Sequence, residues 1–318
     1  MNRRLFAWLR LFLPVALLIC LGAYAYVDSH RASRLSEISA SEASNVSMGA
    51  AMLDRRTQII RHDLNYLVRL NAIQGAAGPD MARMEKSFVE LLRVKPVYDQ
   101  MRWIDASGQE LLRVELKDGQ PFVVAKDQLR NKAGRYYVTE TLKLAAGEVY
   151  ISPLDLNVEN GAIEVPHKPM LRLATPLADG HGEKRGIIVL NYLADEMIQR
   201  FVADSTKGNA SISLLDSTGY WLHSANEADA WGFMFKDASR SLASRLPGSW
   251  AKMQGSSGQF DDENGLWTFA RVYPLGSANE YHWLVVSHLN NKQLSAALNH
   301  SETERFIVTG LLLLLLGG

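Results

Sequence analysis

The sequence predicts an α+β protein in which one long N-terminal helix precedes two related modules of strands, with an apolar segment at each end of the chain. Three observations lead to this prediction. Apolar residues recur at three- and four-residue steps over residues 28–70, which is the period of an amphipathic helix. A turn with flanking strands occurs twice, 111 residues apart. Uncharged apolar runs lie at residues 11–27 and 306–318.

The composition excludes several classes of protein. The 318 residues carry 34 basic and 34 acidic side chains, so the formal net charge is zero and a strongly basic nucleic-acid-binding protein is excluded. Hydrophobic residues make up 47% and charged residues 21%, which excludes a chain that is disordered throughout. Cys20 is the single cysteine, so we expect no intramolecular disulfide and no zinc site built from several thiolates.

The first apolar run has the length and the flanks of a membrane anchor. Residues 11–27 contain no charged side chain, and a transmembrane helix needs about 17 to 25 such residues. Arginines precede the run, so the positive-inside rule places residues 1–10 in the cytoplasm and residues 28–305 outside it. A cleaved signal peptide is the alternative, because Ala23-Tyr24-Ala25 resembles a cleavage site. Both alternatives export the middle of the chain.

We expect residues 28–70 to continue this helix as a stalk. The region lacks proline, and its apolar residues recur with helical spacing: Leu35, Ile38, Val46, Leu53, Ile60, Leu64, Leu67 and Val68. A helix longer than about 25 residues is typical of coiled-coil pairing or of a signalling stalk. Because the apolar stripe has no obvious partner within the chain, we expect a homodimer through this helix.

Two strand-rich modules are expected after the stalk, at residues 71–208 and 209–289. Each contains an Asp-x-(Ser/Thr)-Gly turn between two strands, at residues 105–108 in the first and 216–219 in the second. A second pair of similar segments follows the turns in the same order, which favours duplication of one module. A short helix is predicted at residues 81–94, before the first turn.

The C-terminal end of the chain is expected to return to the membrane. Residues 290–305 have a helical pattern and are predicted to form a linker. Residues 306–318 read FIVTGLLLLLLGG, which is too short to span a bilayer. We interpret them as the truncated start of a second transmembrane helix; the alternative is the hydrophobic tail of a complete protein.

Four segments carry a resemblance to a known family: VYISPLDLN at 149–157, PHKPMLRLATP at 166–176, GIIVLNY at 186–192 and WGFMF at 231–235. With the order of elements, they resemble the double Cache family, the tandem PAS-like extracytoplasmic sensor domains of bacterial transmembrane receptors of the histidine kinase and diguanylate cyclase type. The resemblance implies a location at the bacterial inner membrane with a periplasmic sensing region. It also implies a ligand pocket in the membrane-distal module and a cytoplasmic output domain.

Members of this family that bind amino acids carry a Tyr/Arg/Trp motif with a later tyrosine and aspartate. Tyr98, Arg102 and Trp103 are similar to that motif, and Tyr150 supplies a further tyrosine. Asn191 stands where the aspartate is expected, so the usual counter-ion of an α-ammonium group is absent. This departure favours a carboxylate or another anion as the ligand.

The candidate ligand-binding residues are cationic and aromatic side chains of the first module and their polar neighbours. They are Arg102, Trp103, Arg113, Tyr136, Tyr150, Asp155, His167, Lys168, Arg172 and Asn191. An arginine presents a planar fork of donors that matches a carboxylate. The alternative is that the arginines pair with nearby acidic residues on the surface.

No motif in the sequence indicates catalysis. There is no HExxH pattern, no GxxxxGK(S/T) loop and no GxSxG elbow, so we expect no metal, no cofactor and no catalytic site in this segment. We therefore predict the sensing region of a transmembrane receptor that passes a ligand-induced displacement to a cytoplasmic output domain. The alternative is a membrane-anchored exported binding protein or enzyme without such an output.

Overall fold

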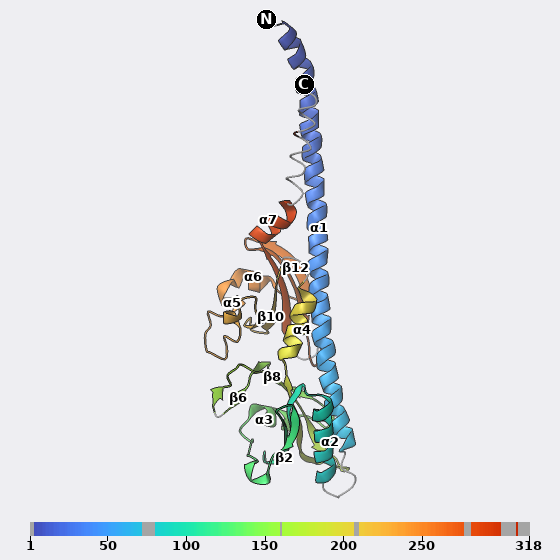
Figure 1. The fold of residues 1–318 in the computed structure, drawn as a ribbon, viewed down its shortest axis with the longest axis vertical. Helices are drawn as coiled ribbons and strands as arrows, with labels where there is room; N and C mark the ends of the chain where they lie inside the picture. The colour runs from blue at the N-terminus through green and yellow to red at the C-terminus, as the bar shows by residue number, and fades with distance from the viewer. Residues whose placement is uncertain are drawn as a thin grey trace.

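One long helix runs beside two antiparallel sheets (Figure 1). The computed structural model describes residues 3–71, 80–159, 161–206, 210–276, 281–299 and 310. The helix α1 (Arg3–Leu70) is continuous, which confirms the prediction of a long N-terminal helix. Among the described residues, no helix is both long enough and apolar enough to cross a membrane. Apart from residue 310, the predicted segment 306–318 lies outside the described residues.

The first sheet has the strand order β3-β2-β1-β9-β8-β4, and β5 also pairs with β8. Its strands are β1 (Tyr98–Ile104), β2 (Glu110–Lys117), β3 (Gln120–Val123), β4 (Tyr150–Ile151), β5 (Asp155–Leu156), β8 (Pro169–Ala178) and β9 (Lys184–Leu193). Around it lie the helices α2 (Met81–Val94), η1 (Lys126–Gln128) and α3 (Tyr136–Lys143), and the hairpin of β6 (Val158–Glu159) and β7 (Ala162–Ile163). The predicted helix at residues 81–94 is confirmed as α2.

The two faces of this sheet have different neighbours, because successive side chains of a strand point to opposite faces. Met101 and Trp103 of β1 belong to the apolar core shared with α1 and α2. On the other face, Ile104 and Val189 pack against Tyr137 of α3. Since α3 contacts β4, β8 and β9, part of this second face remains available for a cavity.

The second sheet has the strand order β11-β10-β14-β13-β12. Its strands are β10 (Ser211–Asp216), β11 (Trp221–His223), β12 (Ser257–Asp262), β13 (Gly265–Val272) and β14 (Trp283–Asn290). The accompanying helices are α4 (Asp195–Ser205), η2 (Glu227–Asp229), α5 (Leu242–Arg245), α6 (Pro247–Lys252) and α7 (Asn291–Asn299). The order β11-β10-β14-β13 matches β2-β1-β9-β8, so both sheets share a four-strand arrangement.

The turn after the first strand has the same hydrogen bonds in both sheets. One oxygen of Asp105 accepts bonds from the backbone N–H of Ser107 at 2.8 Å, from the Ser107 hydroxyl at 2.7 Å and from the N–H of Gln109 at 2.9 Å. Asp216 accepts the equivalent three bonds at 2.8–2.9 Å. The glycine that follows has a φ of 86° at Gly108 and 91° at Gly219, a conformation that favours glycine. This aspartate turn explains why the sequence pattern occurs twice.

The apolar stripe of α1 packs against the sheets of its own chain. Val46, Leu53, Ile60, Leu64 and Leu67 are at most 2% exposed, and all belong to the main apolar core. The expectation that this stripe lacks an intramolecular partner is therefore wrong. An amphipathic pattern predicts a buried face, but it does not identify the surface that covers that face.

The last strand and the last described helix are joined without a loop, because β14 ends at Asn290 and α7 begins at Asn291. The Asn290 side-chain oxygen accepts a bond from the N–H of Gln293 at 2.9 Å, and the Gln293 side chain accepts one from the N–H of Asn290 at 2.9 Å. This reciprocal pair has the form of a capping box, which fixes the start of a helix. The remainder of the predicted linker lies outside the described residues.

Candidate ligand-binding cavity

A polar cavity of about 680 Å3 lies over the first sheet, on the face that also carries α3. Its lining comes from β1, β2, β8 and β9, from the segment between β3 and α3, and from the β6–β7 hairpin. The lining residues are Gln100, Arg102, Arg113, Glu115, Gln128, Arg130, Lys132, Arg135, Tyr137, Asn157, Val158, Glu159, Gly161, Arg172 and Asn191. Ligand pockets commonly have volumes of about 300–1,000 Å3, so the cavity has a suitable size.

Strand register brings the polar residues of the cavity floor together. Arg102 of β1 pairs directly with Arg113 of β2. Asn191 of β9 pairs with Gln100 of β1 on one side and with Arg172 of β8 on the other. Four adjacent strands therefore present a row of polar side chains to the same face, because residues two apart along a strand share a face.

Glu110 holds the arginines at one end of this floor. Its side chain is fully buried, and it forms an ion pair of 3.1 Å with Nε of Arg102. The Nη1 group of Arg113 donates to the other oxygen at 3.2 Å, and the backbone N–H of Arg130 donates to the same oxygen at 3.0 Å. One buried carboxylate thus anchors two floor arginines and the segment that leads to α3, and breaking such a buried pair is strongly destabilising.

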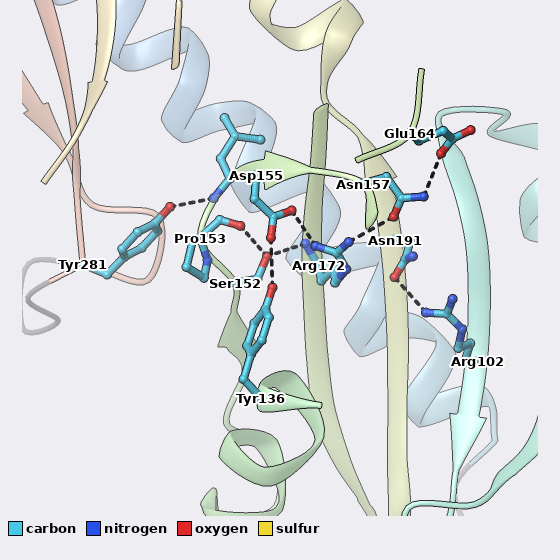
Figure 2. Close-up of polar contacts among 11 residues, drawn as sticks. Arg102, Tyr136, Ser152, Pro153, Asp155, Asn157, Glu164, Arg172, Asn191 and Tyr281 are labelled. Atoms are coloured by element: carbon cyan, nitrogen blue, oxygen red, sulfur yellow. Dashed lines mark hydrogen bonds and ion pairs between the residues drawn. The ribbon is translucent and has the colours of Figure 1, made fainter. Parts of the chain in front are cut away.

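Arg172 is held at the other end of the floor, as Figure 2 shows. Its Nη1 donates to Asp155 at 2.7 Å and its Nη2 to the side-chain oxygen of Asn157 at 3.1 Å. The hydroxyl of Tyr136 donates to the second oxygen of Asp155 at 3.2 Å. Burial raises the pKa of Asp155 although Arg172 opposes the shift, and burial together with Asp155 raises the pKa of Tyr136 to about 12. These contacts fix the direction of the Arg172 guanidinium.

Three further cations lie on the segment between β3 and α3, which forms the rim of the cavity. Within the part of the chain that the structure describes, the side chains of Arg130, Lys132 and Arg135 have no carboxylate partner. The pKa of Lys132 is lowered by burial, and nearby arginines lower it further although Glu110 opposes the shift. The rim therefore carries positive charge that the protein itself does not neutralise.

Four of the predicted site residues line the cavity: Arg102, Arg113, Arg172 and Asn191. Arg102 donates to the side-chain oxygen of Asn191 at 3.3 Å, and both side chains are buried (Figure 2). Asp155 and Tyr136 are not in the lining and contact the site through Arg172. The idea that the arginines pair with acidic residues also holds, since Glu110 and Asp155 are their partners, but these pairs lie at the cavity and not on an open surface.

The other four predicted residues lie elsewhere. Trp103 requires a correction: it is 3% exposed and packs in the core on the opposite face of the sheet, because it follows Arg102 directly in β1. Tyr150 packs at the edge of the apolar cluster under α3. The exposed ring of His167 lies 5.6 Å from the ring of Phe235, and Lys168 forms ion pairs with Glu164 and Asp99.

The predicted Tyr/Arg/Trp motif is also divided between the two sides of the sheet. Tyr98 is 1% exposed, and its hydroxyl donates to Asp63 of α1 at 2.5 Å. Tyr98 and Trp103 therefore stabilise the packing of the sheet on the long helix. Only Arg102 of the three contributes to the cavity lining.

Sequence reasoning missed the rim cations, and it placed Glu110 among the surface partners of the arginines and not in a buried position. A signal for the rim was present, because residues 126–135 contain four basic side chains and one acidic one. The role of Glu110 follows from a contact with Arg130, twenty residues away, which no local pattern reveals. Gln100 was open to prediction, since it lies two residues before Arg102 in the same strand.

Comparison with known protein families decides the identity of the chain. A model for the sensor domain of bacterial histidine kinases matches residues 71–306. The chain belongs to this family. It is a sensor domain of the kind found in bacterial histidine kinases. No curated protein sequence matches the chain significantly.

Solved structures support the same fold for this sensor domain. A domain of a sensory box/GGDEF family protein from Vibrio parahaemolyticus has a TM-score of 0.62 at 20% identity, over 84% of this chain and 99% of that one. The extracellular domain of the histidine kinase vpHK1S-Z8 has a TM-score of 0.63 at 19% identity, over 87% and 99%. The ligand-binding domain of the Pseudomonas aeruginosa amino acid chemoreceptor PctC, in complex with GABA, has a TM-score of 0.53 at 12% identity, over 79% and 98%.

Proposed function

We propose that this sensor domain detects a small anionic molecule with a carboxylate group in the cavity over the first sheet. The observation that carries the proposal is the set of rim cations without carboxylate partners, which line the same cavity as Arg102, Arg113 and Arg172. Arginine forms strong bidentate hydrogen bonds with carboxylates. An anionic ligand neutralises charge that the folded chain leaves uncompensated, so its binding is favourable in this partly desolvated site.

The ligands of similar structures support a carboxylate. PctC was solved with GABA, and the Campylobacter jejuni chemoreceptor Tlp3 was solved with isoleucine and with L-valine. Each of these molecules carries a carboxylate group. In this chain, Asn191 lies at the floor of the cavity beside Arg172 and supplies no negative charge for an ammonium group. This favours ligands whose recognition depends on the carboxylate alone.

The proposed setting is a bacterial transmembrane receptor. Residues 11–27 form its first membrane helix and residues 306–318 the start of a second, and residues 28–305 form the periplasmic part with two PAS-like Cache modules at 71–208 and 209–289. The apolar runs and the arginines before the first run support this topology. The shared strand order of the two sheets supports the division into modules. The receptor passes the signal to a cytoplasmic output domain of the histidine kinase or diguanylate cyclase type.

A homodimer through α1 forms part of this proposal. Met48, Ile59, Tyr66 and Leu70 are 39–59% exposed, and their spacing of eleven, seven and four residues brings them to one face of the helix. Disulfide crosslinking in membranes tests this face in a Cys20→Ser background. Tyr66→Cys should crosslink to a second copy, whereas Leu53→Cys, at a fully buried position, should not. Equal crosslinking at both positions would argue against the dimer.

Ligand binding is tested by calorimetry and thermal unfolding of the purified full chain in detergent micelles. A panel of small carboxylates is compared with neutral amides of the same size. Binding of at least one carboxylate should raise the unfolding temperature, and Arg102→Gln or Arg172→Gln should abolish that rise. Arg200→Gln is the control, because the side chain of Arg200 is exposed on α4, whereas those of Arg102 and Arg172 are buried. A rise that survives both floor substitutions would exclude this cavity as the site.

A further inference from the structure

We propose that the ligand carries two carboxylate groups, one bound by the floor of the cavity and one by its rim. The inference rests on the proposed function and specifies the ligand class of the same site. The floor group is recognised by Arg102, Arg172 and Asn191, and the rim group by Arg130 and Lys132.

The charges around the cavity indicate a ligand with two negative charges. Six cationic side chains line the cavity: Arg102, Arg113, Arg130, Lys132, Arg135 and Arg172. Four carboxylates lie close to these cations. Glu115 and Glu159 belong to the lining, whereas Glu110 and Asp155 form ion pairs with Arg102 and Arg172. The difference is an excess of two positive charges. A zwitterion leaves this excess unchanged and a monocarboxylate removes half of it, whereas a dicarboxylate removes it completely.

The floor offers a defined position for the first carboxylate. Arg102 and Arg172 lie on either side of Asn191, which is 2% exposed (Figure 2). The Asn191 side-chain oxygen accepts a bond from Arg102, while its NH2 group has no hydrogen-bond partner among the described residues. A donor that is nearly buried and lines a cavity without a partner is ready to bind an acceptor of a ligand. Because Asp155 and Asn157 already orient Arg172, little side-chain entropy is lost when that acceptor binds.

The rim offers a second position on a different part of the chain. Arg130 and Lys132 lie between β3 and α3, and neither side chain has a carboxylate partner in the described structure. Burial and the neighbouring arginines lower the pKa of Lys132, although Glu110 opposes the shift, as expected for a cation among other cations. Glu110 accepts a bond from the backbone of Arg130 and also pairs with Arg102, so it holds the two positions in a fixed relation. A fixed distance between the floor and the rim positions selects ligands by the number of carbon atoms between their two carboxylates.

Calorimetry on the purified full chain in detergent micelles, at one ionic strength, tests the inference. The probes are the dicarboxylates malonate to adipate, the monocarboxylates propionate to hexanoate, and inorganic phosphate. We expect one dicarboxylate to bind more tightly than the monocarboxylate of equal length by about tenfold or more, as the loss of one charge-assisted hydrogen bond predicts. Lys132→Gln should weaken that dicarboxylate by about tenfold and leave monocarboxylate binding unchanged. Lys143→Gln, at an exposed lysine of α3, is the control.

The outcomes separate this inference from the proposed function. If monocarboxylates bind as tightly as dicarboxylates and Lys132→Gln has no effect, the second carboxylate is excluded while the anion site remains. Binding of phosphate without any dicarboxylate also overturns the dicarboxylate class. If no carboxylate of either kind binds, both proposals fail. Circular dichroism of each variant confirms that it is folded, and Arg130→Gln provides a second test of the rim.

Discussion

The backbone N–H of Leu154 donates a hydrogen bond to the hydroxyl of Tyr281 over 3.0 Å, and this bond joins the first sheet region to the second (Figure 2). Trp283 of β14 donates its indole N–H to the same hydroxyl at 2.7 Å. Leu154 immediately precedes Asp155, which pairs with Arg172 at the cavity floor. The residues Leu154 and Asp155, with one hydrogen bond on each side, therefore connect Arg172 of the cavity to Tyr281 before the second sheet's strand β14.

Tyr281→Phe should lower the free energy of unfolding by about 1–3 kcal/mol, because it leaves the buried Trp283 indole without this acceptor. Urea unfolding followed by tryptophan fluorescence measures the change. Tyr66→Phe in dilute protein is the matched control, since Tyr66 is 59% exposed on α1 of the single chain and should change stability by less than about 0.5 kcal/mol. Equal effects of the two substitutions would show that the contact between the sheets contributes nothing.

His288 should make the second sheet less stable at acidic pH. Its ring stacks on Trp267 at 3.6 Å, and burial lowers its pKa below the ordinary value although a bond to the Asn264 carbonyl opposes the shift. Below a pH of about 6.5 the unfolded chain binds a proton at this ring that the folded chain does not bind. The free energy of unfolding contributed by this group is therefore complete above that pH and falls as the pH decreases.

The variant His288→Phe isolates this contribution, because it keeps an aromatic ring over Trp267 and removes the titrating group. Urea unfolding at about pH 7.5 and about pH 5.0 compares the two proteins on either side of the ordinary histidine pKa. The native chain should lose more stability than the variant over that interval. The pKa of His223 is also lowered by burial, but His223 is present in both proteins and cancels in the comparison. Parallel losses would refute the assignment to His288.

Gly49 should be required for the contact between α1 and α4. A Cβ atom at this position would lie 2.4 Å from the Ser205 hydroxyl and 2.9 Å from the ring of Phe201. Gly49→Ala should therefore destabilise the protein by about 1–3 kcal/mol, although alanine favours a helix more than glycine does. Thermal unfolding measures this, with Ser47→Ala on the exposed side of α1 as a control that should have little effect. A Gly49→Ala protein that is more stable than the native chain would contradict this requirement, because it would show that α1 and α4 can move apart without loss of stability.

Leu53→Ala should show that the inner stripe of α1 belongs to the core of its own chain. Leu53 is fully buried, so truncation should cost about 2–5 kcal/mol at every protein concentration. Ile59→Ala, at a residue that is 41% exposed, should leave the stability of a dilute protein nearly unchanged. Chemical unfolding at two protein concentrations distinguishes them, and a Leu53→Ala effect that vanishes on dilution would assign this residue to a dimer contact instead.

Local patterns predicted the parts of the fold that depend on neighbours in the chain. The aspartate turns at Asp105 and Asp216 form from residues within four positions, and α2 begins where Asp80 caps the N–H of Arg83. Alternation along β1 also contained the information that places Arg102 and Trp103 on opposite faces, so the assignment of both to one pocket was avoidable.

The parts that the sequence did not predict depend on distant contacts. The rim lies over the floor because Glu110 binds the backbone of Arg130, and no periodic pattern links these positions. Tertiary packing also decides which surface covers the apolar stripe of α1. The spacing of residues such as Leu53 and Ile60 is the same whether the stripe packs on a second copy or on the sheets of its own chain.

No loop residue separates β14 from α7, so the second sheet and the helix that follows it are directly joined. A flexible loop would absorb a shift of the strand, whereas the paired side chains of Asn290 and Gln293 make the joint stiff. A movement of β14 along its own axis must therefore carry the first turn of α7 by the same distance. The capped junction thus couples the position of the helix start to that of the strand end.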